Sequence, residues 1–161
     1  MLELLLPFFL LVLFLLTLLS IWRINTRKYL SSATVASAYD AWTQDKLLER
    51  LWGEHIHLGF YPLGKKNIDF RKAKVQFVHE LVKWSGLDEL PKGSRILDVG
   101  CGIGGSSRIL AKYYGFNVTG ITISPAQVRR ARELTPHGLN CNFQVMDALD
   151  LKFEDGTFDA V

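Results

Sequence analysis

The stretch Arg95-Ile-Leu-Asp-Val-Gly-Cys-Gly-Ile-Gly-Gly-Ser-Ser-Arg108 decides the fold class of this 161-residue chain. Its first five residues form a short apolar run after a Pro/Gly turn, which predicts a strand. The residues from Gly100 to Gly105 predict a loop, and those from Ser106 to Tyr114 predict a helix that stops at Gly115. Glycines between a strand and a helix let the backbone approach a ligand closely.

The alternation of strands and helices continues to the end of the sequence. A run rich in β-branched residues, Asn117 to Ile123, predicts a second strand, and Ser124 then caps a helix that begins with Pro125. Residues 141–145 predict a third strand and residues 158–161 the start of a fourth. This order predicts an α/β fold with a parallel sheet and crossover helices. Three strands and the start of a fourth are too few to form a parallel sheet that is covered on both faces, so we interpret the chain as a fragment.

The sheet is preceded by a preamble, residues 23–90, which we predict to be helical. Apolar residues at helical spacing between residues 35 and 52 predict one or two helices, and residues 69–85 predict another that ends at Gly86. The aromatic, glycine-containing stretch between them, residues 52–61, predicts an irregular loop over the site. The expected division is therefore 1–22 anchor, 23–90 preamble and lid, and 91–161 sheet domain.

The N-terminal segment is strongly apolar, with no charge in the 19 residues from Leu4 to Trp22. As a helix it spans about 28 Å, close to the hydrocarbon thickness of a bilayer. A cleavable signal peptide is the alternative, but its basic flank would precede the apolar run, whereas here Arg23 and Lys28 follow it. We expect a single-pass transmembrane anchor, with the remaining chain on the cytoplasmic face of a plasma or thylakoid membrane.

Composition excludes several classes of protein. The 19 Lys and Arg against 16 Asp and Glu give a net charge of +3, too mild to argue for nucleic acid. Two cysteines, Cys101 and Cys141, provide neither a disulfide framework nor a metal cluster. The pair His55 and His57 is weak as a metal site because no further Cys or His cluster supports it, so no metal is predicted.

A basic run lies between the loop and the sheet. It predicts either a solvated helix face or contact with anionic lipid head groups. Its members are Lys65, Lys66, Arg71, Lys72 and Lys74.

The glycine loop also satisfies G-x-G-x-x-G, so a nicotinamide-dependent reductase must be weighed. A dinucleotide fold has an acidic residue about 20 positions later, to bind a ribose, but Thr122 and Ser124 occupy that place. The loop also has Asp98 just before its first glycine, where that signature does not require a carboxylate. The long helical preamble is a third difference.

The stretch from Ile96 to Arg108 resembles the first motif of S-adenosylmethionine-dependent methyltransferases. It is most similar to the branch with the tocopherol methyltransferases and the 2-methyl-6-phytyl-benzoquinol methyltransferases of photosynthetic bacteria, and closer to the latter. Four further stretches carry the likeness: Tyr39-Asp-Ala-Trp42, Trp52-Gly-Glu-His-Ile-His-Leu-Gly59, Gly120-Ile-Thr-Ile-Ser-Pro-Ala-Gln127 and Phe153-Glu-Asp-Gly-Thr-Phe-Asp159.

The resemblance implies a Rossmann-like class I methyltransferase sheet in the strand order 3-2-1-4-5-7-6, truncated here after the start of strand 4. It also implies S-adenosylmethionine as cofactor and a prenylated quinol in lipid as substrate. For the methionine end of the cofactor it implies that Asp98 orders the loop and reaches the amino group. The residues lining that end would be Gly100, Cys101, Gly102 and Gly104.

The other parts of the cofactor are expected at the ends of the second and third strands. The resemblance implies that Asp147 accepts a hydrogen bond from the adenine amine, with Ala148 beside it, and that Tyr39 closes over the cofactor. The residues expected by the ribose are Thr122, Ile123, Ser124 and Gln127.

Methylation of a quinol ring carbon is helped by a base that takes the phenol proton. We predict Glu54, His55 and His57 as candidates, with the alternative that they only pin their loop by hydrogen bonds. The predicted function is therefore C-methylation of a prenylated benzoquinol in tocopherol or plastoquinone biosynthesis. Alternatives are a methyltransferase for another lipid (tocopherol O- or sterol C-methylation), a nicotinamide-dependent reductase, or a membrane-tethered binding module.

Overall fold

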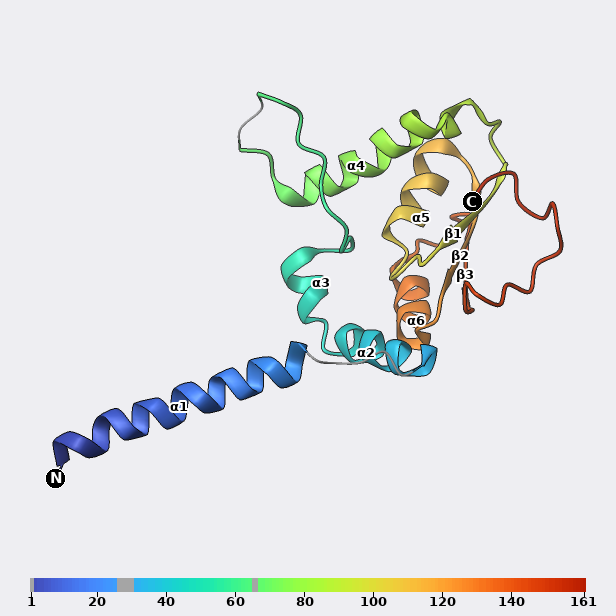
Figure 1. Ribbon diagram of the computed structural model, residues 1–161. Coiled ribbons are helices and arrows are strands. Elements are labelled where there is room, and N and C mark those ends of the chain that lie inside the picture. Colours follow the sequence, from blue (N-terminus) through green and yellow to red (C-terminus); the bar gives the residue numbers. More distant parts are fainter. Residues whose placement is uncertain (1, 26–30, 65–66) are drawn as a thin grey trace. The chain divides into compact units, whose positions relative to one another are not determined.

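A computed structural model of the chain describes residues 2–25, 31–64 and 67–161 (Figure 1). The chain forms two compact units, residues 1–31 and residues 32–161. Each unit is described by itself below.

The first unit contains one helix, α1 (Leu2–Asn25), with Pro7 in its first turns. Proline is tolerated near a helix start because its missing N–H has no intrahelical partner there. Within residues 2–25, 31–64 and 67–161, no helix has enough length and apolar character to cross a membrane. Residues 2–22 of the predicted transmembrane anchor are helical, as expected, but they are not supported as a membrane span.

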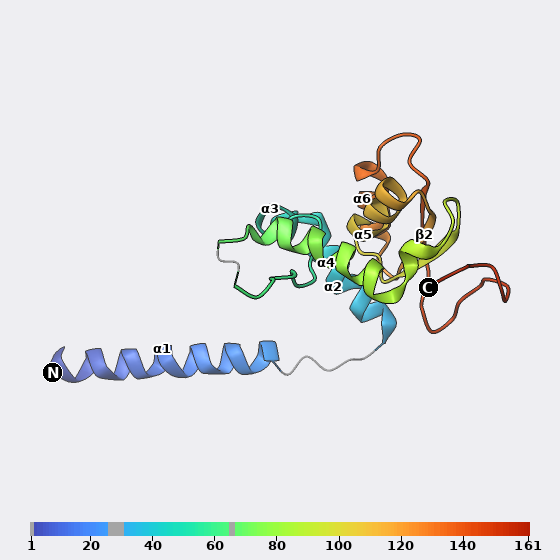
Figure 2. The ribbon, with the colours of Figure 1, turned by 90° about the horizontal axis from the view of Figure 1, so that it is seen from above.

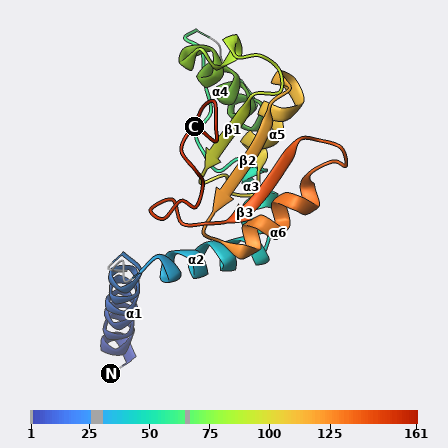
Figure 3. The ribbon, with the colours of Figure 1, turned by 90° about the vertical axis from the view of Figure 1, so that its right-hand side faces the viewer.

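The second unit is built on a parallel three-stranded sheet in the order β1-β2-β3 (Figure 3). Its strands are β1 (Arg95–Val99), β2 (Asn117–Thr122) and β3 (Cys141–Val145), which confirms the three predicted strands to within one residue. A parallel bridge joins Ala160 to Ile96, on the free side of β1. The expected order 3-2-1-4 is therefore present as far as the chain extends.

The helices between the strands begin and end at the residues that the sequence indicates. After β1 come α5 (Gly105–Ile109) and its π-helical continuation η2 (Leu110–Tyr114), which ends at Gly115. After β2 comes α6 (Pro125–Leu134), capped by Ser124, whose hydroxyl accepts from the Gln127 N–H at 3.1 Å. The predicted cap and the proline at the first helical position are confirmed.

Helices α4, α5 and α6 lie on one side of the strands, and the irregular segment after β3 forms a wide loop on the other (Figures 1 and 2). The core lies between the helices and the sheet. Its buried apolar side chains form two clusters, one by α4 and η2 and the other by α6. The first consists of Val82, Ile96, Leu110, Ala111, Phe116 and Val118, and the second of Cys101, Val128, Ala131 and Phe143.

The preamble consists of α2 (Ser32–Gln44), α3 (Leu47–Trp52), α4 (Phe70–Ser85) and the short turn η1 (Leu87–Glu89). Asp69 caps α4 by accepting from the Lys72 N–H at 3.0 Å, and Gly86 ends it in the left-handed conformation. The preamble therefore has the predicted helices, with two of them between residues 32 and 52.

The loop after α3 packs directly on α4. The Phe60 N–H donates to the Ala73 carbonyl at 2.8 Å, and a Cβ at Gly59 would come within 2.6 Å of the Ala73 side chain. Lys74, 5% exposed, donates to the carbonyls of Trp52 and His55 at 3.2 and 2.7 Å.

Lys74 and Arg71, two members of the basic run, therefore hold the end of α3 and the loop after it by hydrogen bonds to their backbone, a role that neither predicted alternative included. Arg71 acts like Lys74, since its Nη2 donates to the Arg50 carbonyl at 2.7 Å. Lys65 and Lys66 lie outside the described residues.

Candidate functional site

A cavity of about 370 Å³ lies where the carboxyl ends of the three strands meet the preamble. Ligands of open α/β sheets bind at this edge. The lining comes from the glycine loop, the residues after β2 and β3, and the loop of residues 53–57. It comprises Tyr39, Glu54, His55, Ile56, His57, Asp98, Val99, Gly100, Cys101, Gly102, Ile103, Gly105, Ser106, Ile121, Thr122, Ile123, Gln127, Met146 and Ala148.

The glycine loop is open toward this cavity at two of its positions. Gly100 and Gly102 have φ of +75° and +56°, and a Cβ at either would meet nothing within 4 Å. Gly104 is different, because its Cβ would lie 2.6 Å from the ring of Phe143. Gly100 and Gly102 thus leave room for a ligand, whereas Gly104 permits the close packing of the loop on β3.

Asp98 lies at the start of the loop, and its carboxylate accepts from the hydroxyl of Ser107 on α5 at 2.6 Å. Burial raises its pKa, while the Ser107 hydrogen bond and nearby His57 oppose that shift. The carboxylate therefore ties the end of β1 to α5 and lines the cavity, as expected of a group that orders the loop.

The structure places Cys101 differently from its glycine neighbours. Its side chain is only 9% exposed and packs in the core cluster with Val128, Ala131 and Phe143. Burial raises the pKa of its thiol to about 12. A ligand in the cavity would meet the backbone of Cys101 rather than a reactive thiolate.

The residues expected by the ribose are connected to one another. The Thr122 hydroxyl donates to the side-chain oxygen of Gln127 at 2.7 Å, and both residues line the cavity with Ile123. Ser124 is fully buried and donates to the Asp40 carboxylate at 2.5 Å. Ser124 therefore holds the preamble and does not line the cavity.

Asp40 is a site-building residue that the sequence reasoning missed. It projects from α2, and its carboxylate also accepts from the Ala126 N–H at 2.9 Å. A negative charge at the N-terminus of α6 is favoured by the helix dipole. The sequence signal for Asp40 was its place in the motif Tyr39-Asp-Ala-Trp42, which carried the resemblance. Its neighbour Tyr39 lines the cavity.

After β3, Met146 and Ala148 line the cavity while Asp147 is outside the lining. The Asp147 carboxylate accepts from the Leu149 N–H at 2.9 Å, so it closes its own turn. Ala148 thus lines the cavity, whereas the Asp147 carboxylate, which was expected to face an adenine, is engaged within its own turn. Met146 was not predicted; its apolar side chain suits a flat ring system.

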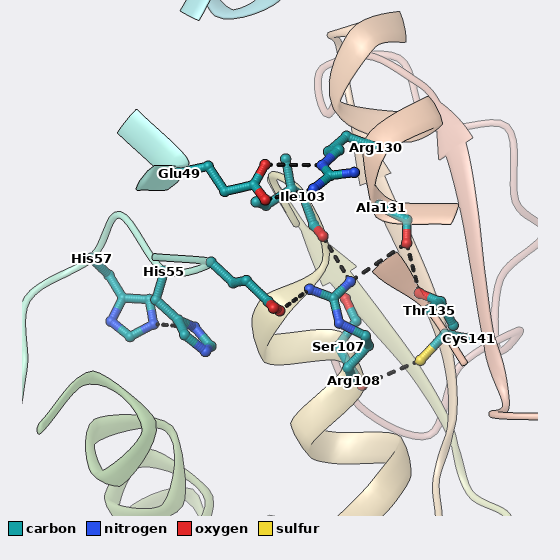
Figure 4. A network of polar contacts seen from close by, with 11 residues as sticks. Glu49, His55, His57, Ile103, Ser107, Arg108, Arg130, Ala131, Thr135 and Cys141 are labelled. Atoms are coloured by element: carbon teal, nitrogen blue, oxygen red, sulfur yellow. Dashed lines mark hydrogen bonds and ion pairs between the residues drawn. The ribbon is translucent and has the colours of Figure 1, made fainter. Parts of the chain in front are cut away.

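Glu54 forms an ion pair with Arg108, a largely buried residue of α5 (8% exposed), at 2.5 Å. The other arm of this guanidinium donates to the Ile103 carbonyl at 2.8 Å and approaches the Ala131 carbonyl at 3.5 Å (Figure 4). Arg108 thus connects the preamble, the glycine loop and α6. This geometry favours the alternative in which Glu54 pins its loop.

His55 and His57 are linked to each other above the cavity (Figure 4). Their nearest nitrogens, His57 Nε2 and His55 Nδ1, lie 3.1 Å apart, and His57 Nδ1 lies 2.8 Å from the Leu58 carbonyl oxygen. Burial, followed by the nearby His57, lowers the pKa of His55 to about 4. His55 is therefore uncharged at neutral pH.

Among the described residues, no three or more His, Cys, Asp or Glu side chains gather to hold a metal ion. The cavity instead offers what a nucleoside with an amino-acid tail requires: open glycines, a carboxylate and an apolar wall. The residues present therefore fit such a cofactor.

Comparison with known proteins gives a consistent result. Residues 96–161 match the family described as methyltransferase domain. The chain is 58% identical over 144 residues to a 2-methyl-6-phytyl-1,4-hydroquinone methyltransferase of Synechocystis, covering 88% of this chain and 44% of that protein. It is 41% identical over 125 residues to a chloroplastic tocopherol O-methyltransferase of Arabidopsis thaliana, covering 71% and 36%. The chain thus spans less than half the length of these curated relatives.

Solved structures share the fold. A sarcosine dimethylglycine methyltransferase, described as putative, from Galdieria sulphuraria matches with a TM-score of 0.65 and 27% identity, covering 75% of this chain and 46% of that one. A geranyl diphosphate C-methyltransferase from Streptomyces coelicolor, in complex with S-adenosyl-L-homocysteine, matches with a TM-score of 0.58 and 25% identity, covering 79% and 51%.

Proposed function

We propose that the complete protein belongs to the methyltransferase-domain family that residues 96–161 match, and that it methylates a ring carbon of a prenylated benzoquinol with S-adenosylmethionine. The observation that carries this proposal is the cavity at the strand ends, where two open glycines and Asp98 face the preamble. The Synechocystis relative, named for a phytyl hydroquinone, supports the substrate class.

The cofactor supplies a methyl group on a sulfonium, which carries its own leaving group. The residues that would hold it line the cavity: Asp98 and the backbone of the glycine loop would bind its amino-acid end, Thr122 and Gln127 its sugar, and Met146 its base. What the protein must add is alignment, because holding a nucleophile in line at about 3 Å supplies much of the rate.

The preamble completes the site from above. Tyr39, Ile56 and the two histidines line the same cavity, and Glu54 fixes their loop to α5 through Arg108. A cavity covered in this way would limit the access of water to a bound sulfonium. We retain His57 and His55 as the proposed catalytic residues, and we describe Glu54 as a positioning residue because Arg108 engages it.

We also propose a membrane location for the complete protein, with its catalytic part on the cytoplasmic face. The described side chains of α1 from Phe9 to Leu16 are all apolar and at least 36% exposed. A prenyl tail partitions into lipid while the charged cofactor stays in water, so the reaction belongs at that boundary. Flotation of the complete protein with vesicles, with and without residues 1–25, tests this location.

The function is tested by incubating the purified complete protein with radiolabelled S-adenosylmethionine and one lipid acceptor at a time. The acceptors are 2-methyl-6-phytyl-1,4-benzoquinol, a tocopherol and a sterol. A ring-methylated quinol is expected; an ether or a methylated sterol would assign another lipid. Titration with S-adenosylhomocysteine and with NADH distinguishes the classes, because tight binding of NADH alone would contradict a methyltransferase. Cofactor binding without any transfer would indicate a binding module.

A further inference from the structure

The two histidines over the cavity make a directed chain of hydrogen bonds. His57 Nδ1 lies 2.8 Å from the Leu58 carbonyl oxygen, which can only accept. His57 Nδ1 therefore carries a hydrogen in each charge state of the ring. In neutral His57, Nε2 then carries no hydrogen and can only accept a hydrogen bond.

This arrangement determines the tautomer of the second ring. His57 Nε2 lies 3.1 Å from His55 Nδ1, so when both rings are neutral His55 Nδ1 must be the donor. The proton of neutral His55 is then on Nδ1, and its Nε2 is the free base of the pair. Both rings line the cavity that Asp98 and the glycine loop share.

We propose that His55 and His57 form a two-imidazole proton relay, in which His55 Nε2 accepts the phenolic proton of the acceptor and His57 holds it. The proposal rests on the proposed function, because only a phenolic acceptor needs this proton removed. His55 is the catalytic residue, since it meets the substrate, and His57 acts through it.

The protons and electrons of the step balance. The phenol O–H proton goes to His55 Nε2 as the His55 Nδ1 proton moves to His57 Nε2, leaving His55 neutral in its other tautomer and His57 as imidazolium. The ring carbon then forms a bond to the methyl carbon, and the electron pair of the broken carbon–sulfur bond stays on sulfur. The methylated ring carbon then loses its hydrogen to water as a proton, which restores the aromatic ring. The relay returns its own proton to the phenol oxygen, so one proton is released in all.

The surroundings of the pair favour this direction. Burial of His55 disfavours a positive charge on that ring most strongly, and the nearby His57 comes next. Glu54 favours such a charge, while Arg108 and Lys74 each oppose it more weakly. The relay places the charge on His57, which donates to the Leu58 carbonyl and lies near the Asp98 carboxylate, and whose ring centroid lies 5.5 Å from that of Phe77 at an interplanar angle of 39°. The proton therefore passes through His55 and remains on His57.

The first test does not depend on activity. In the ¹⁵N-histidine NMR spectrum of the complete protein at neutral pH, without substrate, both rings are expected as the Nδ1–H tautomer with bare Nε2. Observation of neutral His55 protonated on Nε2 would overturn the proposal.

The second test is His57→Asn, whose amide can still donate to the Leu58 carbonyl but cannot take up a proton. At neutral pH its kcat should fall about 100-fold with little change in KM for the quinol. Its rate should rise about tenfold per pH unit toward the phenol pKa near 10. The matched control is H137N, an exposed histidine.

The outcomes separate the two proposals. An unchanged kcat and pH profile in H57N, with wild-type methylation intact, would overturn the relay alone. Failure of the wild-type protein to methylate any phenol would overturn the proposed function, while the NMR tautomers would still report on the hydrogen-bond chain.

Discussion

The ion pair between Glu49 of α3 and Arg130 of α6 should contribute about 1–2 kcal/mol to the folded state. Its two hydrogen bonds, at 2.9 and 2.6 Å, engage both carboxylate oxygens, and the side chains are 22% and 20% exposed. Fully exposed pairs contribute about 0.2–1 kcal/mol, and hydrogen bonds to charged groups in buried settings about 1.5–3 kcal/mol. Because this bidentate pair is partly buried, its contribution to stability should lie between these values.

The assay is a double-mutant cycle on the complete protein with Glu49→Gln and Arg130→Met, using urea unfolding. Glu133→Gln is the matched control, because Glu133 also contacts Arg130, at 2.9 Å, but is 60% exposed, so less than about 0.5 kcal/mol is expected. A coupling free energy between Glu49 and Arg130 below about 0.3 kcal/mol would refute the reasoning.

The same pair predicts a pH dependence. Arg130 lowers the pKa of Glu49, so this carboxylate is more acidic in the folded than in the unfolded chain. Its contribution is therefore complete above the unfolded pKa of about 4.3 and is lost as pH falls through the folded value. The stability gap between wild type and E49Q should be constant from pH 7 to about 5 and then close. A gap that widened on acidification would contradict the assignment.

Four further substitutions test the site. Gly102→Ala, whose Cβ meets nothing within 4 Å, should cost about 1–2 kcal/mol of stability through its left-handed φ but weaken S-adenosylhomocysteine binding at least tenfold in calorimetry. Gly104→Ala should instead unfold at markedly lower temperature, because its Cβ lies 2.6 Å from the Phe143 ring. Cys101→Ala should leave cofactor affinity within about threefold of wild type, because the buried thiol faces the core. Burial raises the pKa of this thiol to about 12, so wild-type Cys101 should also resist iodoacetamide at pH 8, unlike a reactive cysteine. Asp40→Asn should lower stability by about 0.5–2 kcal/mol in urea unfolding, because it weakens the cap of α6.

The regular elements were predictable from the sequence because their signals are local. The run from Arg95 to Val99 is apolar and bounded by turn residues, and Ser124-Pro125 combines a cap with a first helical residue. These patterns reflect backbone geometry within a few residues, so tertiary packing does not change the elements that they predict. The parallel order followed because crossover helices leave few alternatives.

The contacts that build the site could not be predicted in the same way, because they join residues far apart in the sequence. Ser124 looked like a ribose neighbour, but its hydroxyl is 84 positions from the Asp40 carboxylate that it binds. Glu54 looked like a base, but a buried guanidinium 54 positions later engages it. Residue type indicates which chemistry is possible, whereas the partner is determined by the tertiary packing.

The preamble and the sheet domain should act as one unit in cofactor binding. Three acidic residues of the preamble, Asp40, Glu49 and Glu54, each bind α5 or α6, the helices that follow β1 and β2. Tyr39 and His55, which line the cavity, lie beside two of them in the sequence. Because docking of the preamble completes the cavity, any cofactor that contacts both parts must favour the docked state. By linkage, each contact that stabilises docking must then also increase cofactor affinity.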